Sequence, residues 1–324
     1  WIIMETGKPE KYFKSEASPS DDILLAVIVA SYNSKKYLQK CIDSVIKFIP
    51  EKDKELIEII IVDNNSTDGS KELVEEFCRN HFFIRSIMND KNMGFAYANN
   101  QAISSSSADY FFLLNSDTEI FENSIENVLR YIKNDIPSDK IGILGPKIIN
   151  SDGTVQDSCR KFPSLINAAA HNILSLINPD NRFSRHYKMS DADRSRSFET
   201  DWVSGSAMLI SKAALNISGL FDEKYFMYVE DVDLCYRMWQ SGYKVIYFPD
   251  IKVLHHIGKS GDNNPVKVQK LMQKSALRFF LKVNKKSWKI ILIPFVLPIL
   301  GLRIFLTWVK CRKSGNTECT RNKR

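Results

Sequence analysis

LLAVIVA at residues 24–30 is an unbroken apolar run, and the first half of the chain also contains YFFLL at 110–114 and LIEIIIV at 56–62, which is apolar apart from Glu58. Continuous apolar runs of this length are typical of strands buried on both faces of a sheet. Stretches of about a dozen residues with helical spacing lie between them. The alternation predicts an α/β fold, with a mostly parallel sheet flanked by helices.

The same patterns predict elements along most of the chain. The expected strands are 24–30, 56–62, 82–87, 110–114, 141–149, 202–210 and 244–248. The expected helices are 36–48, 68–79, 95–104, 165–177, 228–240 and 266–280, with a polar, arginine-rich loop over 178–200.

Polar residues follow three of the predicted strands, as SYN at 31–33, DNN at 63–65 and NSDT at 115–118. Ligands of open α/β sheets bind beyond the carboxyl ends of the strands. Three polar strand ends at one sheet edge therefore predict a nucleotide site. Within it, Asp117 could hold Mg²⁺ or Mn²⁺ together with a pyrophosphate, or could merely form a turn. Asp63 could contact a base or ribose, or could cap the next helix.

Glu230, Asp231 and Asp233 crowd three carboxylates into four residues at the start of a predicted helix. Mutual repulsion raises the proton affinity of at least one of them, so the cluster could supply a general base. Stabilisation of the helix dipole by acids in the first turn is the structural alternative. Because Glu230 and Asp231 are adjacent, we expect at most one of them to face a substrate. His255 and His256 follow a strand, and one of them could be a further metal ligand.

The order of seven motifs resembles the family 2 glycosyltransferases, and most closely their bacterial rhamnosyltransferase-like branch, which builds cell-surface polysaccharides. The resemblance covers residues 24–260. The motifs are SYN (31–33), VDNNSTDGS (62–70), NMGFAYANN (92–100), LLNSDT (113–118), WVSGSAMLI (202–210), GLFDEKYFMYVEDVDLCYR (219–237) and VLHHIGKS (253–260).

The resemblance implies a GT-A fold, a nucleotide-sugar donor and an inverting transfer. By position, it makes Asp231 the catalytic base and gives the metal to Asp117 and His255. The implied donor-binding residues are Tyr32, Asn33, Asp63, Asn92, Gly94, Asn100, Asn115 and Asp117. The acceptor or sugar pocket is expected to include Trp202, Gly205 and Glu230. Asn115 departs from the family's DxD metal motif by replacing its first carboxylate, so we expect a weak Mg²⁺ or Mn²⁺ site that depends on the donor phosphates.

Charge is distributed unevenly along the chain. Residues 1–258 carry 29 Lys and Arg against 36 Asp and Glu, whereas residues 259–324 carry 16 against 2. A nucleic-acid-binding surface would not leave the first part acidic, so we expect no nucleic-acid partner. Three regions follow: an extension (1–21), a glycosyltransferase domain (22–260) and a basic, apolar C-terminal region (261–324).

The apolar stretch at residues 290–309 is long enough to cross a bilayer but contains Pro294, Pro298 and Arg303. Lysines flank it on both sides, which suits an anionic cytoplasmic membrane surface. We therefore expect a helical membrane-associating extension, either in the plane of the membrane or spanning it. A buried helix in an oligomer is the alternative. A lipid-linked saccharide acceptor would share that surface.

The remaining features agree with a cytoplasmic enzyme. Six widely spaced cysteines are expected to be reduced thiols, and no signal peptide is visible. The chain begins with Trp1 rather than Met, so we expect that it is not the full gene product.

Two other functions stay open. A sugar nucleotidyltransferase would share the sheet and the metal, but it should carry a glycine-rich phosphate loop where this chain has residues 31–34, SYNS. A catalytically silent membrane-bound module would not need Asp63, Asp117, Asp231 and His255 together.

Overall fold

The computed structural model describes residues 11–13, 23–134, 140–163, 181–256, 264–285 and 287–313. The predicted helix 165–177 therefore lies outside the described residues, as does nearly all of the extension 1–21.

The first half of the chain folds as alternating strands and helices, as the apolar runs predict. Its strands are β2 (Leu25–Ser31), β3 (Ile57–Asp63), β4 (Ile84–Met88) and β5 (Tyr110–Asn115), and the helices between them are α1 (Lys35–Phe48), α2 (Ser70–Asn80) and α3 (Phe95–Ser104). The strands β1 (Lys11–Phe13) and β6 (Thr118–Ile120), the 3-10 helix η1 (Glu51–Leu56) and the helix α4 (Ser124–Asn134) are further elements that the pattern analysis did not identify.

The second half extends the same sheet with the parallel pair β7 (Ile141–Asn150) and β12 (Lys244–His255) and with the antiparallel strand β11 (Ala207–Ser211). Its other elements are β8 (Cys159–Arg160), α6 (Arg182–Lys188), β9 (Phe198–Glu199), β10 (Trp202–Val203), α7 (Lys212–Ser218) and α8 (Glu230–Gln240). The main sheet has the order β1-β4-β3-β2-β5-β11-β7-β12-β6, and β9 pairs with β12. β2 is parallel to β3 and β5, whereas β11 is antiparallel to β5 and β7.

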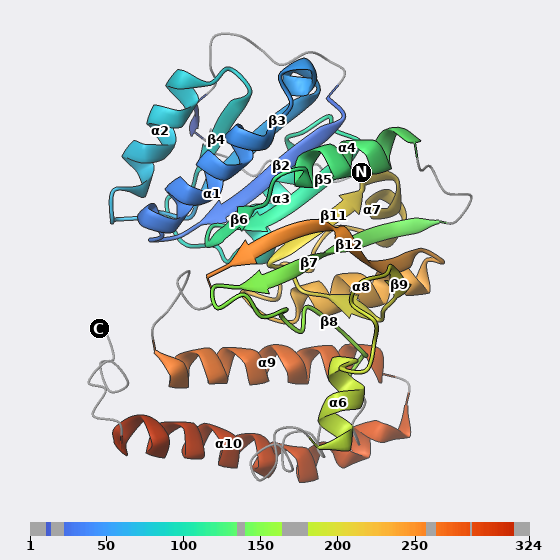
Figure 1. Cartoon of the computed structure of the whole chain (residues 1–324). Coiled ribbons are helices and arrows are strands. Elements are labelled where there is room, and N and C mark those ends of the chain that lie inside the picture. The colour runs from blue at the N-terminus through green and yellow to red at the C-terminus, as the bar shows by residue number, and fades with distance from the viewer. Residues whose placement is uncertain are drawn as a thin grey trace, which may run out of the picture.

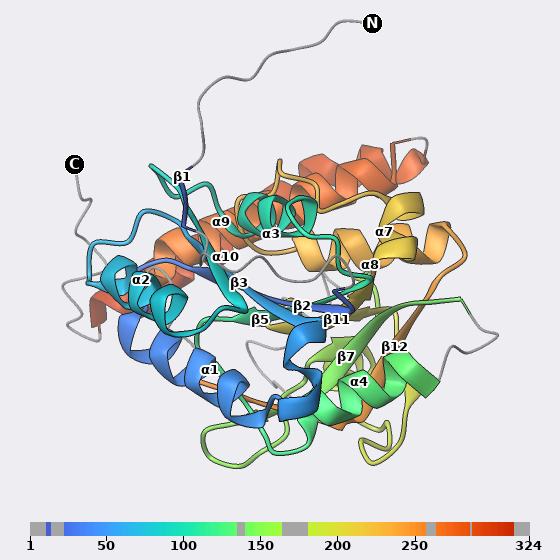
Figure 2. The ribbon, with the colours of Figure 1, turned by 90° about the horizontal axis from the view of Figure 1, so that it is seen from above.

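Helices cover both faces of the sheet (Figures 1 and 2). One apolar core lies under α1, α2 and α4, and a second lies under α3, α7 and α8. The central strands β2 and β3 are buried almost throughout, which explains their largely apolar sequence, and the buried Glu58 of β3 pairs with Arg85 at 2.7 Å.

Three expected elements differ from the structure. The predicted loop 178–200 contains α6, and the predicted strand 202–210 is two strands separated by a turn at Gly205. The helix expected from Tyr228 begins two residues later, because Tyr228 and Val229 have left-handed backbones (φ +69° and +70°) that a helix cannot include.

The C-terminal region forms α9 (Pro265–Val283), the 3-10 helix η2 (Trp288–Leu292) and α10 (Ile293–Lys313). Figure 1 shows α9 below the sheet and α10 beyond it, and the two helices pack together. Among the described helices, none combines the length and the apolar character that crossing a membrane requires.

The cysteines partly match expectation. Cys41, Cys78, Cys159 and Cys235 are buried free thiols. Cys311 is disulfide-bonded, so the expectation of reduced thiols is wrong for this residue.

Candidate active site

The polar ends of three parallel strands meet at one edge of the sheet. In the register of the sheet Ser31 lies opposite Asp63, and Ala30 lies opposite Asn115. Strand pairing thus brings together residues that are more than 80 positions apart in the sequence. This is the arrangement that the polar strand ends predict.

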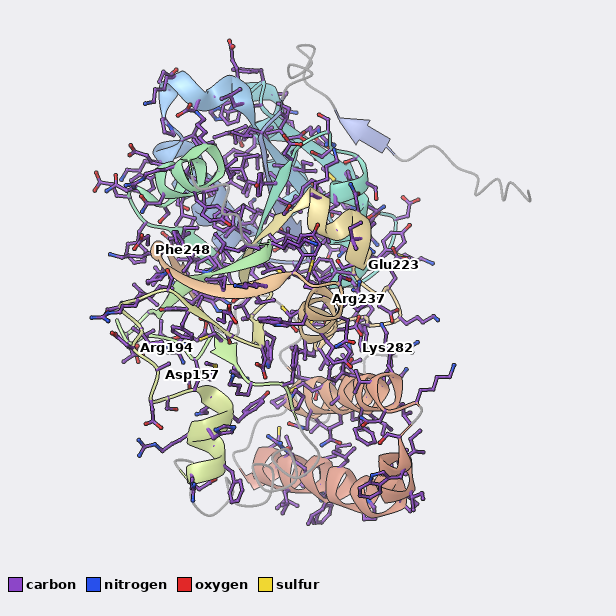
Figure 3. All side chains as sticks on the ribbon, turned by 90° about the vertical axis from the view of Figure 1, so that its right-hand side faces the viewer. Asp157, Arg194, Glu223, Arg237, Phe248 and Lys282 are labelled. Carbon is purple, nitrogen blue, oxygen red and sulfur yellow. The ribbon has the colours of Figure 1, made fainter. Side chains whose placement is uncertain are left out.

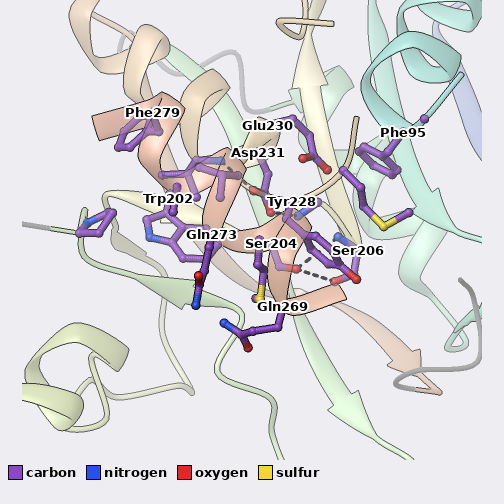
Figure 4. Close-up of a pocket in the computed structure, with 18 of the residues that line it drawn as sticks. Phe95, Trp202, Ser204, Ser206, Tyr228, Glu230, Asp231, Gln269, Gln273 and Phe279 are labelled. Atoms are coloured by element: carbon purple, nitrogen blue, oxygen red, sulfur yellow. Dashed lines mark hydrogen bonds between the residues drawn. The ribbon is translucent and has the colours of Figure 1, made fainter. Parts of the chain in front are cut away.

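A cavity of about 660 Å³ opens at this edge and extends toward the C-terminal helices. Figure 4 shows the part of this pocket around Asp231. The residues of the predicted site that line it are Tyr32, Asn92, Gly94, Asn115, Trp202, Gly205, Glu230, Asp231 and His255.

Asp231 is held at the start of α8 by two backbone donors. The amide of Gly205 donates to its Oδ2 at 2.9 Å, and the amide of Val232 donates to its Oδ1 at 2.8 Å. A Cβ at position 205 would lie 3.5 Å from the Oδ2 of Asp231, which is an ordinary van der Waals distance. Burial raises the pKa of Asp231, while these hydrogen bonds and the Arg160 guanidinium oppose the rise. A carboxylate with a raised pKa is better matched to accept a proton near neutral pH.

Glu230 also lines the cavity, beside Asp231. Both neighbours thus contribute to the cavity lining, whereas the sequence led us to expect that at most one of them would face a substrate. Burial and the charge of Asp231 raise the pKa of Glu230 well above its usual value. Its Oε2 has no hydrogen-bond partner among the described residues. Of these two acids, only Asp231 accepts hydrogen bonds from two backbone amides, which together with Arg160 favour its ionised form.

Asp233, the third acid of the cluster, has a structural role. It is fully buried and pairs with Arg237 on α8 at 2.9 Å and with Lys282 on α9 at 2.8 Å. Figure 3 shows Arg237 and Lys282 on neighbouring helices on the same side of the molecule. This ion-pair network ties α8, which carries Asp231, to α9.

Asp117 and His255 lie together at the strand edge. The Nε2 of His255 is 3.3 Å from the Oδ1 of Asp117, and its Nδ1 is 3.2 Å from the Oε1 of Gln156. Asp117 is buried and is not part of the cavity lining, although His255 and Asn115 are. Among the described residues, no group of three or more His, Cys, Asp and Glu is placed to hold a metal ion.

Asp63 is fully buried behind the cavity lining. Its Oδ2 accepts a 2.8 Å hydrogen bond from the amide of Ser66, which is the capping role considered from the sequence. Its Oδ1 has no partner among the described residues, and burial raises its pKa. The predicted contact of Asp63 with a donor nucleotide is therefore not available in this structure, because Asn64 and not Asp63 lines the cavity.

Two predicted donor residues are engaged by the protein itself. The Asn100 side chain bonds to both backbone groups of Phe221 and to Glu223, and the Asn33 side chain accepts from the Thr67 amide. Neither lines the cavity. Both asparagines therefore stabilise the surrounding loops by hydrogen bonds within the protein.

Arg160 was not identified from the sequence. Its guanidinium lies over the rings of Tyr187 and Trp202, at 5.7 and 5.2 Å from their centroids, and it lines the cavity. It favours the ionised form of Asp231. No motif marks it, because it reaches the site only through the pairing of β8 with β10.

The chain shares sequence with known proteins over most of its length. Residues 26–212 match the family described as glycosyl transferase family 2. The chain is 29% identical to an N-acetylglucosaminyl-diphospho-decaprenol L-rhamnosyltransferase of Mycobacterium tuberculosis, over 82% of this chain and 87% of that protein. It is 24% identical to the rhamnosyltransferase WbbL of Escherichia coli, over 72% and 83%.

Solved structures agree on the fold. A mannosyltransferase of Pyrobaculum calidifontis, in complex with GDP-Man and Mn²⁺, superposes with a TM-score of 0.54 at 14% identity, over 96% of this chain and 81% of that one. GalNAc-T7, with UDP, GalNAc and Mn²⁺, superposes with a TM-score of 0.57 at 16% identity, over 81% and 48%. These similarities confirm the predicted GT-A architecture.

The family match covers more than half of the chain and includes the strand edge where the cavity opens. The family match favours the glycosyltransferase over the two alternatives, the sugar nucleotidyltransferase and the catalytically silent module. The chain belongs to glycosyltransferase family 2 and is a glycosyltransferase of its rhamnosyltransferase-like branch.

Proposed function

We propose that this enzyme transfers a sugar, with inversion, from a nucleoside-diphosphate sugar to a lipid-linked saccharide, using Asp231 as the base. The observation that carries the proposal is the Asp231 carboxylate, fixed by two backbone amides inside the cavity that opens at the strand edge. Rhamnose is the proposed sugar because relatives over most of the chain are named as rhamnosyltransferases.

The reaction is a single displacement. Asp231 accepts the proton of an acceptor hydroxyl as its oxygen attacks the anomeric carbon of the donor. The bond from that carbon to the nucleoside diphosphate breaks on the opposite side, and the diphosphate leaves with the electron pair. One displacement without a covalent enzyme intermediate inverts the anomeric configuration. Tyr32, Asn64, Asn92 and Asn115 line the part of the cavity where the donor would lie.

Asp117 and His255 fit a divalent cation that is shared with the donor. Their side chains are 3.3 Å apart beside the cavity, and Mg²⁺ is often held by only one or two protein groups plus substrate phosphates. Mg²⁺ or Mn²⁺ at this place would neutralise negative charge on the departing diphosphate. The Gln156 side chain would orient His255.

Asp117→Ala is expected to lower transfer by about 10- to 100-fold. It is also expected to abolish the Mn²⁺-dependent part of the thermal stabilisation by the donor, because the donor diphosphate loses its cation. The measurement is a thermal shift with deoxythymidine-diphosphate rhamnose, UDP-glucose and UDP-galactose, each with and without Mn²⁺. Glu119→Gln is the control, since Glu119 pairs with His256 outside the cavity. Equal Mn²⁺ dependence in Asp117→Ala and wild type would place the cation elsewhere.

The C-terminal region is proposed to hold the enzyme on the cytoplasmic face of an anionic membrane. Large apolar side chains are exposed along η2 and α10, among them Trp288 (69%), Ile291 (70%), Leu302 (55%) and Phe305 (55%). Exposed apolar surface of this extent marks an interaction site. The basic residues of the region supply attraction to anionic lipids.

Replacing Trp288, Leu302 and Phe305 together with serine is expected to abolish sedimentation with vesicles of phosphatidylcholine and phosphatidylglycerol, because the apolar contact is lost. Ile217→Ser is the matched control, since Ile217 is equally exposed (68%) but lies on α7. Undiminished sedimentation of the triple variant would rule out this surface as the membrane contact.

A further inference from the structure

The catalytic cavity continues past Asp231 into the C-terminal helices. Beyond Trp202 and Ser204 its lining passes to α9, and then to Ile293, Leu300 and Arg303 on α10. Both helices lie outside the segment that matches the family, which ends at residue 212. The residues that line this end of the cavity therefore lie beyond the part of the chain that matches the family.

α9 presents an unpaired amide to the cavity. Gln273 is only 8% exposed, and neither its Nε2 nor its Oε1 has a hydrogen-bond partner among the described residues. Gln269 lies one turn earlier on the same face. Figure 4 shows both glutamines among the side chains that project into the pocket with Trp202 and Ser204. A buried amide without hydrogen-bond partners lowers the stability of the protein. A ligand with hydroxyl or amide groups, such as a sugar, would supply the missing partners to this pair.

Arg303 presents a cation to the same cavity. It lies in an apolar part of α10, it is half-buried, and no described acid is paired with it. Burial alone lowers its pKa, with no contribution from a neighbouring charge. A guanidinium in such surroundings favours an anion, and phosphate matches its planar donors best.

The two faces of α10 link this cavity to the proposed membrane surface. Leu300 and Arg303 are one turn apart and face inward, whereas Leu302, Phe305 and Leu306 are exposed. On the α9 side the lining is mostly apolar, with Met272, Ala276, Leu277, Phe280 and Val283. The cavity thus offers, in order from the sheet, a base, amide groups, and then a cation among apolar side chains.

We propose that the end of the cavity between α9 and α10 is the acceptor subsite, and that it binds a saccharide joined to a lipid through phosphate or diphosphate. Gln273 bonds to the acceptor sugar, Arg303 pairs with its phosphate, and the apolar lining receives the first part of the lipid chain. The inference rests on the proposed function and assigns its acceptor to residues of this chain. A soluble saccharide would leave Arg303 and the apolar lining without a counterpart.

The test is direct binding to the full chain, without a donor. The two ligands are N-acetylglucosamine linked through diphosphate to a short prenyl chain, and the same sugar and chain joined without phosphate. Wild type is expected to bind the diphosphate ligand on the order of tenfold more tightly. Arg303→Gln is expected to lose that difference, and Arg303→Lys to keep part of it. Gln273→Leu is expected to weaken both ligands.

Arg312→Gln is the matched control, because Arg312 is an exposed arginine of the same helix that lies over the Trp308 ring. The inference is overturned if Arg303→Gln keeps the preference for diphosphate, or if Arg312→Gln loses it equally. Circular dichroism and thermal unfolding show whether each variant is folded.

Failure of the proposed function gives a different result. Donor binding, measured by thermal shift with nucleotide sugars, does not involve Arg303. An enzyme that binds no nucleotide sugar contradicts the proposed function, whereas one that binds donor but shows no Arg303-dependent acceptor binding contradicts the subsite alone.

Discussion

Asp231→Asn is expected to lower the transfer rate by roughly 100- to 10,000-fold while donor binding stays unchanged. The amide keeps the size of the carboxylate but cannot accept the proton of the acceptor hydroxyl. Asp231 lines the cavity and is held by two backbone amides, whereas burial and the charge of Asp231 raise the pKa of Glu230, and Asp233 pairs with Arg237 and Lys282. The measurement is the steady-state transfer rate together with a thermal shift by the donor.

Glu230→Gln is the matched control. Burial and the charge of Asp231 raise the pKa of Glu230 and so favour its neutral form, which glutamine matches in charge and shape. We expect its transfer rate to stay within about threefold of wild type, far from the loss that removal of a general base causes. Equal losses in the two variants would show that Asp231 is not the base.

The same assignment predicts the direction of the pH dependence. Burial raises the pKa of Asp231, so its ionised form is present only above that raised value. As pH falls through it, the base becomes protonated, and kcat/KM should fall at a pH above the usual aspartate range of about 4. Asp231→Asn should lack this acidic limb in its residual activity.

Gly94→Ala is expected to lower the free energy of unfolding by about 2 to 4 kcal/mol. Gly94 has φ +88° and ψ 173°, a backbone conformation restricted to glycine. A Cβ there would lie 2.3 Å from the carbonyl oxygen of Phe226, which accepts the hydrogen bond of the Phe95 amide. The substitution therefore adds a backbone clash to the conformational strain. It also disturbs the loop that leads to Asp231.

Gly153→Ala separates these two effects. Gly153 has a similar φ of +84°, but a Cβ there would meet no atom within 4 Å. We expect it to cost only the left-handed strain, about 1 to 2 kcal/mol. Chemical denaturation of both variants gives the comparison. Equal losses of stability would mean that the contact with Phe226 relaxes and that strain alone matters at position 94.

The largely apolar runs at residues 24–30, 56–62 and 110–114 predict the parallel strands β2, β3 and β5, because strands buried on both faces need apolar residues at nearly every position. Side-chain periodicity does not reveal very short strands, short helices or left-handed turns. For this reason the start of α8 was predicted two residues early, and α6 was predicted as loop.

The chemistry of the site divides in the same way. Asp231, Asp117 and His255 stand in local motifs, so the sequence by itself determines which groups are available for catalysis. Only the tertiary structure decides which of them are free to act. It places the Asn100 side chain in a hydrogen bond to Phe221, raises the pKa of Glu230, and brings Arg160, Gln273 and Arg303 to the cavity from distant elements. The physical reason is that burial, pairing and pKa depend on neighbours in space, which strand order and helix packing select.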